Sequence, residues 1–245
     1  MSGNKIALSF ALAGILGAST ALAETDGAFV GVQAGYGTAK FKNENKYNEY
    51  NDYTGESKSG EMSGSVKASA FRYGFVAGYK QFFTPEFGAR YYASVDLGAD
   101  YKKDYTDENG DDTIKWSSYN VSANVDALYN FISSDELDFG VFAGVSLGYA
   151  SHKIDLTGRD TEPDNVGASG FDLGINFGLR TNIAQNHGIE LYSRFGVLQQ
   201  KKEISGAFDY TKGYDDRVEV ETTSYKVTPN FQQLYQVGLR YVFSF

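Results

Sequence analysis

The chain has 245 residues and a formal net charge of −9, an acidic balance that argues against nucleic acid or another polyanion as a partner. It contains no cysteine, so neither a disulfide framework nor a thiolate metal site can form. Its 28 Gly, 19 Tyr and 18 Phe beside only 3 Pro favour an all-β protein.

The N-terminal segment has the features of an export signal. A single basic residue, Lys5, precedes an apolar run, and Ala21 and Ala23 form the Ala-x-Ala pattern of a secretory cleavage site. We therefore predict a signal peptide at residues 1–23, cleaved before Glu24. A membrane anchor is the alternative, but Gly, Ser and Thr interrupt a run that is barely long enough to span a bilayer.

The rest of the chain alternates between apolar and polar residues. In "FDLGINFGLRTNI", residues 171–183, most odd positions are apolar and the even positions are polar or glycine, which predicts a strand with one apolar face. Eight such segments can be drawn, at about residues 27–42, 68–83, 88–104, 114–131, 137–155, 169–183, 189–204 and 232–245.

The connections between these segments alternate in length. The short pieces "TPEF", "ISSDE" and "QNHG" follow the second, fourth and sixth segments, whereas longer polar stretches separate the others, the largest at 43–67 and 205–231. Short turns at one end and long loops at the other are typical of a bacterial outer-membrane barrel. We therefore predict that residues 24–245 form an all-β domain: an eight-stranded antiparallel transmembrane β-barrel with short periplasmic turns and long extracellular loops, in a Gram-negative outer membrane.

A secreted β-sandwich would also alternate, but its strands are usually about half as long. Aromatic residues also gather near the strand ends, as two interface girdles require. The expected girdles contain Phe82, Phe83, Phe87, Tyr129, Phe131, Phe139, Tyr241 and Phe243 at the short-turn end, and Tyr36, Phe71, Tyr73, Tyr101 and Tyr149 at the long-loop end.

The last segment has to pair with the first, because an open sheet edge in lipid leaves backbone donors and acceptors unpaired. Tyr241, Phe243 and Phe245 are then expected to face lipid, while Arg240 and Ser244 face inward. The strongly alternating "VEVETTSYKVT" before this segment indicates that the last strand begins above the membrane, with an interruption near Pro229. A ten-stranded barrel would require that stretch to span the membrane.

Two stretches resemble a known family. The terminal aromatics Tyr241, Phe243 and Phe245 resemble the signal that the barrel-assembly machinery recognises in outer-membrane barrels. More narrowly, "LGINFGLRTNIAQNHGIELYSRFGVL" and "YQVGLRYVFSF" resemble the C-terminal half of the outer-membrane protein family first described from Helicobacter. The resemblance implies an outer-membrane address and a barrel, and the family's members include adhesins and porin-like proteins.

The inward face of the predicted barrel carries charges of both signs. The candidate residues are Lys80, Arg90, Asp96, Asp126, Asp172, Arg180, Glu190, Arg194 and Arg240. An eight-stranded barrel leaves room only for side chains, and unpaired buried charges are costly. We therefore interpret the set as an ion-pair network that fills the lumen, with a narrow, charged pore as the alternative.

Catalysis and metal binding are less favoured. His152 and Ser151 could suggest a lipid A-modifying enzyme, but neighbouring residues on a strand point to opposite faces. His187 has no second ligand nearby and fits a turn. No catalytic residue, metal or cofactor is predicted, and a weak divalent-cation site at Asp107, Asp111 and Asp112 is the alternative to a solvated loop.

The predicted function is that of a surface-exposed outer-membrane barrel with an occluded lumen. It would act in envelope structure or in surface interaction through its loops. A narrow porin is the first alternative, and an adhesin or an enzyme is less favoured. The expected surroundings are outer-membrane lipids, with a host or surface ligand at 43–67 and 205–231 as a candidate partner and the chain as a monomer.

Overall fold

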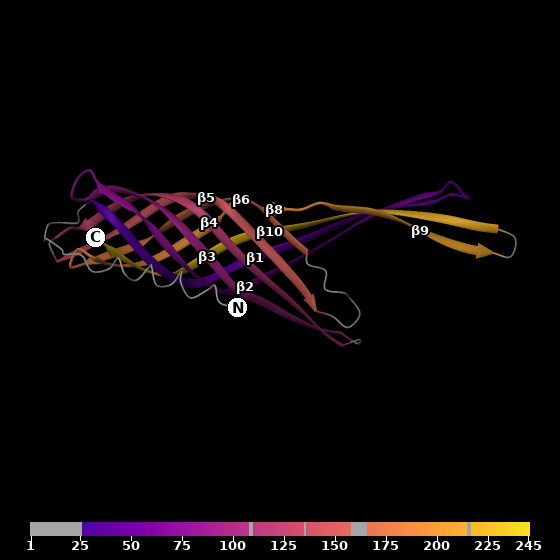
Figure 1. Ribbon diagram of the computed structural model, residues 1–245, viewed down its shortest axis with the longest axis horizontal. Coiled ribbons are helices and arrows are strands. Elements are labelled where there is room, and N and C mark those ends of the chain that lie inside the picture. Colours follow the sequence, from indigo (N-terminus) through magenta and orange to yellow (C-terminus); the bar gives the residue numbers. More distant parts are fainter. Residues whose placement is uncertain (1–25, 108–109, 135, 158–165, 215–216) are drawn as a thin grey trace, which may run out of the picture.

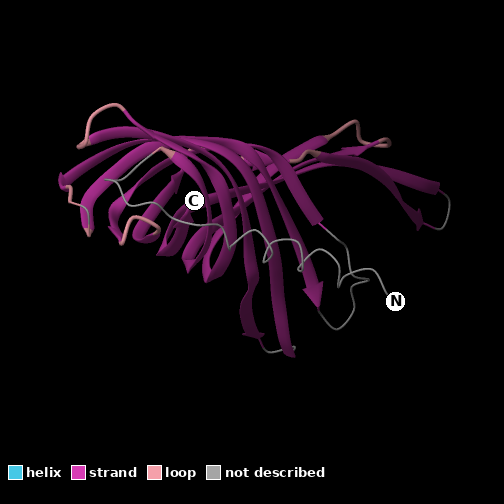
Figure 2. Cartoon of the chain, turned by 60° about the vertical axis from the view of Figure 1, so that its left-hand side comes forward, coloured by secondary structure: helices cyan, strands magenta, loops and turns pink. Residues whose placement is uncertain are grey.

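The computed structural model describes residues 26–107, 110–134, 136–157, 166–214 and 217–245, with the side chains of 99–116, 154–157, 166, 212–214 and 217–219 left out. Every element is a strand (Figures 1 and 2). The strands are β1 (Gly27–Asn51), β2 (Ser57–Phe82), β3 (Phe87–Asp107), β4 (Gly110–Ile132), β5 (Leu137–Thr157), β6 (Val166–Ile183), β7 (His187–Gly196), β8 (Gln200–Lys201), β9 (Ile204–Tyr214) and β10 (Arg217–Ser244).

Eight of these strands close into an antiparallel ring. Each of β1 to β6 pairs with the next strand along the chain, β7 pairs with β10, and β10 returns to β1. The closing seam runs from Phe29 opposite Ser244 outward along the whole of β1. The two remaining strands, β8 and β9, pair only with β10. The predicted eight-stranded barrel is therefore confirmed, and "VEVETTSYKVT" adds no further strand to the ring.

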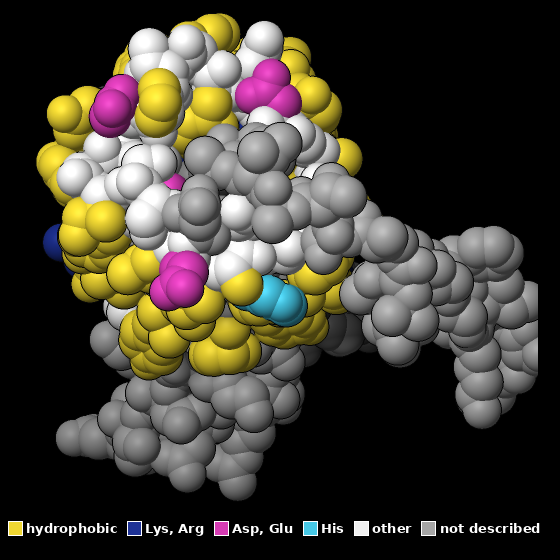
Figure 3. All heavy atoms as spheres, turned by 90° about the vertical axis from the view of Figure 1, so that its left-hand side faces the viewer, with side chains coloured by type: hydrophobic (Ala, Val, Ile, Leu, Met, Phe, Trp, Pro, Cys, Tyr) yellow, Lys and Arg dark blue, Asp and Glu magenta, His cyan; other side chains and the backbone are white. Residues whose placement is uncertain are grey.

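Side chains alternate between a polar interior and an apolar exterior. On the seam, Leu239 is 60% exposed while its neighbour Arg240 is 5% exposed. On β4, Val125 is 55% exposed and Asp126 is fully buried. Figure 3, which looks at the short-turn end, shows hydrophobic side chains around the rim of the barrel. A surface this apolar is stable in lipid, whereas a water-soluble sheet would bury the same residues in its core.

Short connections join the strands at one end of the barrel (left in Figure 1). They lie at 83–86, 133–136 and 184–186, which are the positions predicted for the short turns. In the last of them Ala184 and Gln185 adopt left-handed φ values of 50° and 66°. Asn186 Nδ2 donates to Ser244 O at 2.8 Å, so this turn also fastens the end of the closing strand. In the described part of the chain, no helix is long and apolar enough to cross a membrane.

The prediction of long loops at 43–67 and 205–231 was wrong, because both ranges are largely strands. β1 and β2 stay paired out to Tyr50 opposite Ser57, where a tight turn includes Gly55 at φ 69°. β1, β2, β9 and β10 form a four-stranded sheet that projects from the outer end of the barrel (right in Figure 1). We call this extension, residues 43–64, 204–214 and 217–229, the arm.

β10 is also continuous through Pro229, contrary to the predicted interruption. Pro229 lies opposite Asn43 of β1, and its missing N–H faces the other side, between the end of β8 and the start of β9. Lys202 N donates to Pro229 O at 3.1 Å there, so the proline costs no ladder bond. The predicted strand at 189–204 was too long, since β7 ends at Gly196 and β8 is a separate piece.

Candidate functional site

The barrel interior is the first candidate site, because polar side chains from all eight strands of the ring converge in it. All nine residues of the predicted network lie there with at most 9% of their surface exposed. They are Lys80, Arg90, Asp96, Asp126, Asp172, Arg180, Glu190, Arg194 and Arg240. The strand period of two explains this placement, since each occupies a position that alternates with an apolar, outward-facing neighbour.

Glu190 joins two arginines in the short-turn half of the barrel. One carboxylate oxygen binds Arg90 Nη1 and the other accepts from Arg240 Nη1 at 3.1 Å. Arg90 Nε also donates to Asp126 at 2.9 Å. Both guanidinium groups lie on aromatic rings, Arg90 at 4.4 Å from the centre of the Phe142 ring. Two carboxylates thus balance two buried guanidinium groups, which is the condition under which buried charge is tolerated.

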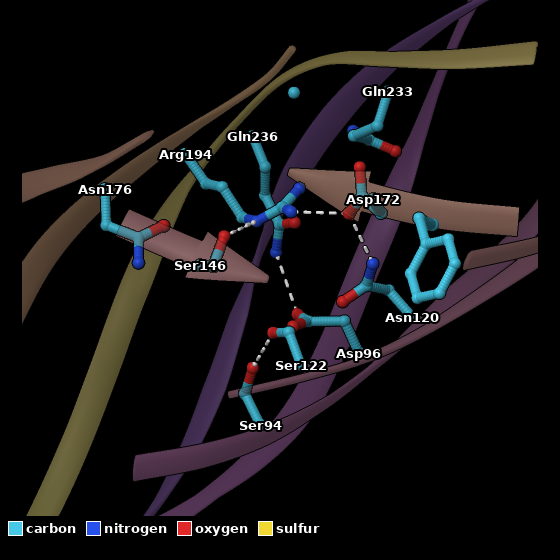
Figure 4. Close-up of polar contacts among 12 residues, drawn as sticks. Ser94, Asp96, Asn120, Ser122, Ser146, Asp172, Asn176, Arg194, Gln233 and Gln236 are labelled. Carbon is cyan, nitrogen blue, oxygen red and sulfur yellow. Dashed lines mark hydrogen bonds and ion pairs between the residues drawn. The ribbon is translucent and has the colours of Figure 1, made fainter. Parts of the chain in front are cut away.

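A second ion pair, Arg194 with Asp172 at 2.5 Å, lies closer to the outer end. Asn120 Nδ2 donates to the same carboxylate at 2.5 Å, and Figure 4 shows Asp172 between these two residues. Asp96 has no arginine against it in the described contacts, and it accepts from Gln33 at 2.6 Å and from Gln236 at 3.2 Å. Amide groups therefore hydrogen-bond to the Asp96 carboxylate in place of a directly paired cation.

Arg72 was missed by the sequence analysis. It is 2% exposed and donates to Gln236 at 3.1 Å, to Ser118 at 2.8 Å and to Gln233 at 3.2 Å. The same alternation that selected Lys80 on this strand also places Arg72 inside, so the signal was present. The interior amides, including Gln33, were equally readable from period two, but a search for charges alone passes over them.

Little space remains between these side chains. Two cavities lie in the network, one lined by residues that include Asp96 and Arg194 and one by residues that include Lys80 and Glu190, and each has a volume of about 10 Å³. A volume of that size holds about one water molecule.

A cluster of apolar side chains lies at the outer end of the lumen. Phe231 packs with Ala39, Ala70 and Ala168, and Phe41 lies against this cluster. The His152 ring stacks on Phe231 with 5.1 Å between ring centres and 3° between planes. We call these residues, together with Gln200 of β8, the outer cap: His152 Nε2 and Gln200 Oε1 are 3.3 Å apart, and Gln200 Nε2 donates to Phe171 O at 2.9 Å.

His152 lies three residues beyond Tyr149, where the outward-facing positions become polar, as at Ser151 and Lys153. It is therefore outside the spanning part of β5. Burial is the main cause that lowers the pKa of His152 to about 4. The hydrogen bond with Gln200 raises this pKa, and the nearby positive charge of Arg72 lowers it further. Ser151 points to the opposite face and is not among the contacts of the imidazole, so the two do not form a nucleophile and base.

We expect the stability of the barrel to fall between pH 6.5 and pH 4 because of His152. In this window the unfolded chain binds a proton that the folded chain does not, so unfolding becomes easier as the pH decreases. The shift from 6.5 to about 4 corresponds to about 3 kcal/mol. Urea unfolding of the refolded protein at several pH values measures it, with His152→Gln as the control. If wild type and variant lose equal stability, His152 is not the group responsible.

The aromatic girdles lie largely where they were predicted, with one correction. Phe83, Phe87, Tyr129 and Phe131 are exposed at the short-turn end. Phe82 instead faces inward and packs with Leu128, Phe142 and Tyr192, because it shares the even, interior register of Lys80. At the outer end Tyr36, Phe71, Tyr73 and Tyr149 are exposed, and the side chain of Tyr101 is outside the described part.

The C-terminal aromatics follow the predicted alternation. Tyr241 and Phe245 are 42% and 47% exposed, Phe243 packs edge-on against Phe245 at 5.4 Å, and Ser244 is buried. His187 Nδ1 lies 2.7 Å from the Tyr241 hydroxyl, which fits the turn role expected for it. Ala21, Ala23 and Glu24 of the predicted cleavage site are outside the described residues, as are the side chains of Asp107, Asp111 and Asp112.

Comparison with solved structures gives small barrels at low identity. The chain is similar to Ail, the attachment invasion locus protein of Yersinia pestis (15% identity, 84% of this chain and 99% of that chain, TM-score 0.31). It is also similar to OprG from Pseudomonas aeruginosa (11% identity, 89% of this chain and 96% of that chain, TM-score 0.41). A third similar structure is Neisserial surface protein A (13% identity, 80% of this chain and 97% of that chain, TM-score 0.36). No protein with a curated description matches the sequence.

The family comparison is more direct. A model of the family described as Helicobacter outer membrane protein matches residues 74–245, a region that begins within β2 and includes the closing strand. The match contains both stretches that carried the resemblance in the sequence. It agrees with the closed ring, the polar interior and the apolar exterior, and it places the protein in the outer membrane. The chain belongs to the Helicobacter outer membrane protein family.

Proposed function

We propose that the protein is a non-conducting outer-membrane barrel whose arm serves in surface interaction. The observation that carries the proposal is the filled lumen: paired charges and amides occupy it, and the two cavities between them measure about 10 Å³ each. An ion crossing such an interior would have to displace buried, charge-assisted hydrogen bonds. The outer cap adds an apolar barrier at the mouth.

The arm supports the second half of the proposal. Outer-membrane barrels carry their longer connections on the extracellular side, so a sheet built from those connections stands outside the cell. It places polar and aromatic side chains on an extension of the barrel sheet, as with Tyr47 and Tyr225, which are 38% and 39% exposed. Binding groups are commonly presented in this way by rigid scaffolds.

Planar bilayer recording with purified, refolded protein tests the occluded lumen. We expect no unit conductance from the wild type at either polarity. The matched control combines Arg90→Ala, Asp126→Ala, Glu190→Ala and Arg240→Ala, which removes two positive and two negative charges together with side chains that fill the short-turn half. This variant is expected to conduct once heat-modifiable mobility shows that it has folded. Reproducible unit conductance of the wild type would overturn the proposal in favour of a narrow porin.

A further inference from the structure

The arm and the adjoining rim of the barrel share a long, unpaired edge along β2. β2 pairs with β3 only from Arg72 opposite Gly98 inward, whereas its pairing with β1 continues outward to Ser57. Within the described part of the chain, residues Ser57–Phe71 therefore have a strand on one side only. The edge contains no proline, and Figure 1 shows the β3–β4 hairpin diverging from it. A row of free N–H and C=O groups of this length is a template for another strand.

The alternation of backbone hydrogen bonds shows which residues offer those groups. Asn51 N donates to Glu56 O, toward β2, while Asp52 N donates to Val220 O, toward β10. Odd residues of β1 in the arm thus bond to β2, and the β2 residues opposite them are even. The N–H and C=O groups of the odd β2 residues consequently point to the free edge. These residues include Glu61, Ser63, Ser65 and Lys67.

This edge is complementary to itself. Glu61 and Lys67 lie three residues before and three residues after Gly64. If a second copy pairs antiparallel with its two-fold axis at Gly64, Glu61 of each copy lies opposite Lys67 of the other. Ser63 then lies opposite Ser65, and both pairs join odd residues, as the hydrogen bonding requires. On the other face Met62 lies opposite Val66. Opposite charges and apolar pairs directly across a sheet both stabilise pairing.

The charges within one copy also favour such a partner. Lys67 lies directly opposite Lys40 of β1, and like charges in that arrangement repel. Glu61 is paired on its inner side with Lys46 at 3.3 Å. In the two-copy sheet, Glu61 of the second copy would stand beside Lys67, so the row across the sheet becomes Lys40, Lys67, Glu61, Lys46. The second copy thereby places a negative charge beside Lys67, whose cross-strand neighbour within its own chain is Lys40.

The direction of the arm determines how two copies can meet. Two antiparallel strands of one sheet are related by an axis perpendicular to that sheet, and the arm runs away from the barrel along the longest dimension of the molecule (Figure 1). The two barrels then lie at opposite ends of the joined arms. We propose that the chain binds a second copy of itself on a facing outer membrane through an antiparallel β2–β2 sheet centred on Gly64. This inference rests on the surface role proposed for the arm.

Charge exchange between two populations of vesicles tests the pairing. Wild-type protein in separately labelled vesicles is expected to cluster them, as measured by light scattering and by energy transfer between labels. Glu61→Lys or Lys67→Glu alone places like charges opposite each other twice, and clustering should fall about tenfold. Mixing the two variant populations makes both contacts attractive again and should restore clustering. If the mixture clusters no better than either variant alone, the inference is wrong.

Proline variants separate edge pairing from damage to the arm. Ser63→Pro removes an N–H that points to the free edge and keeps the β1–β2 ladder, so it should abolish clustering. Ala207→Pro does the same on the opposite edge of the arm, along β9, and should leave clustering unchanged. Equal loss in both variants would contradict pairing through β2.

The register is tested with a single thiol, because the chain has no cysteine. A Cβ at Gly64 has no atom within 4 Å, and two such residues would face each other across the axis at about 4.5 Å between Cα atoms. Gly64→Cys should therefore give a disulfide dimer with diamide, which accepts the two electrons and two protons that the thiols release. Ser59→Cys, far from the axis, should remain monomeric. Equal dimer formation would refute this register.

These results are independent of the lumen. Vesicles that do not cluster, together with silent bilayers, would refute the pairing and leave the occluded barrel standing. Unit conductance together with clustering that follows the charge exchange would refute the occluded lumen and support the pairing.

Discussion

Glu190→Gln is expected to be among the most damaging substitutions in the barrel. The change keeps the shape of the side chain but removes the charge that binds both Arg90 and Arg240. One buried guanidinium charge is then uncompensated, which typically costs about 3 to 5 kcal/mol. The urea midpoint of the folded, heat-modifiable form in lipid measures the loss.

Two further variants show whether charge balance is the cause. Glu44→Gln removes a carboxylate paired with Lys42 at 2.5 Å on the exposed arm, and it should not measurably shift the midpoint. Adding Arg240→Met to Glu190→Gln restores the balance with an apolar chain of similar length and should recover part of the loss. A Glu190→Gln midpoint equal to that of Glu44→Gln would contradict the ion-pair interpretation.

The second large effect is expected at the closing seam, where Gly35 lies opposite Gly238. A Cβ on Gly238 would lie 2.3 Å from Ala34 O and 2.7 Å from the Gly35 Cα atom. Gly238→Val would therefore separate β1 from β10, and their ladder is the last that closes the ring. We expect a loss above about 4 kcal/mol, as for other severe overpacking.

Heat-modifiable mobility in outer membranes measures closure, and the variant should run at the unfolded position before and after boiling. Gly64→Val is the matched control, since the space around a Cβ at Gly64 is open and valine favours strands. Normal folding of Gly238→Val would show that the seam relaxes more than the structure indicates.

The ring was predictable because the membrane imposes a simple rule on it. Lipid outside and packed side chains inside force period two on every strand, so Leu239 and Arg240 could be assigned to opposite faces from the sequence. The same rule places Phe82 and Arg72 inside, and these were misplaced or missed only because residue type was given more weight than register. In both cases position along the strand is the better guide.

The arm was not predictable in the same way. Between Asn43 and Asn51 both faces of β1 are largely polar, so no alternation distinguishes a strand from a loop. What holds this segment extended is its neighbours: β2 on one side and β10 on the other continue the ladder begun in the barrel. Pairing of this kind depends on three distant segments, and local sequence does not contain it.

The continuity of β10 has a mechanical consequence. The strand has 28 residues, a length of roughly 90 Å, and its outer part lies inside the arm while its inner part closes the barrel. A force applied to the arm along its axis would act in shear, so that all the β1–β10 hydrogen bonds bear it at the same time. In peeling, by contrast, the bonds would break one after another. Tension between two surfaces would therefore reach the membrane anchor through a ladder that resists it along its whole length.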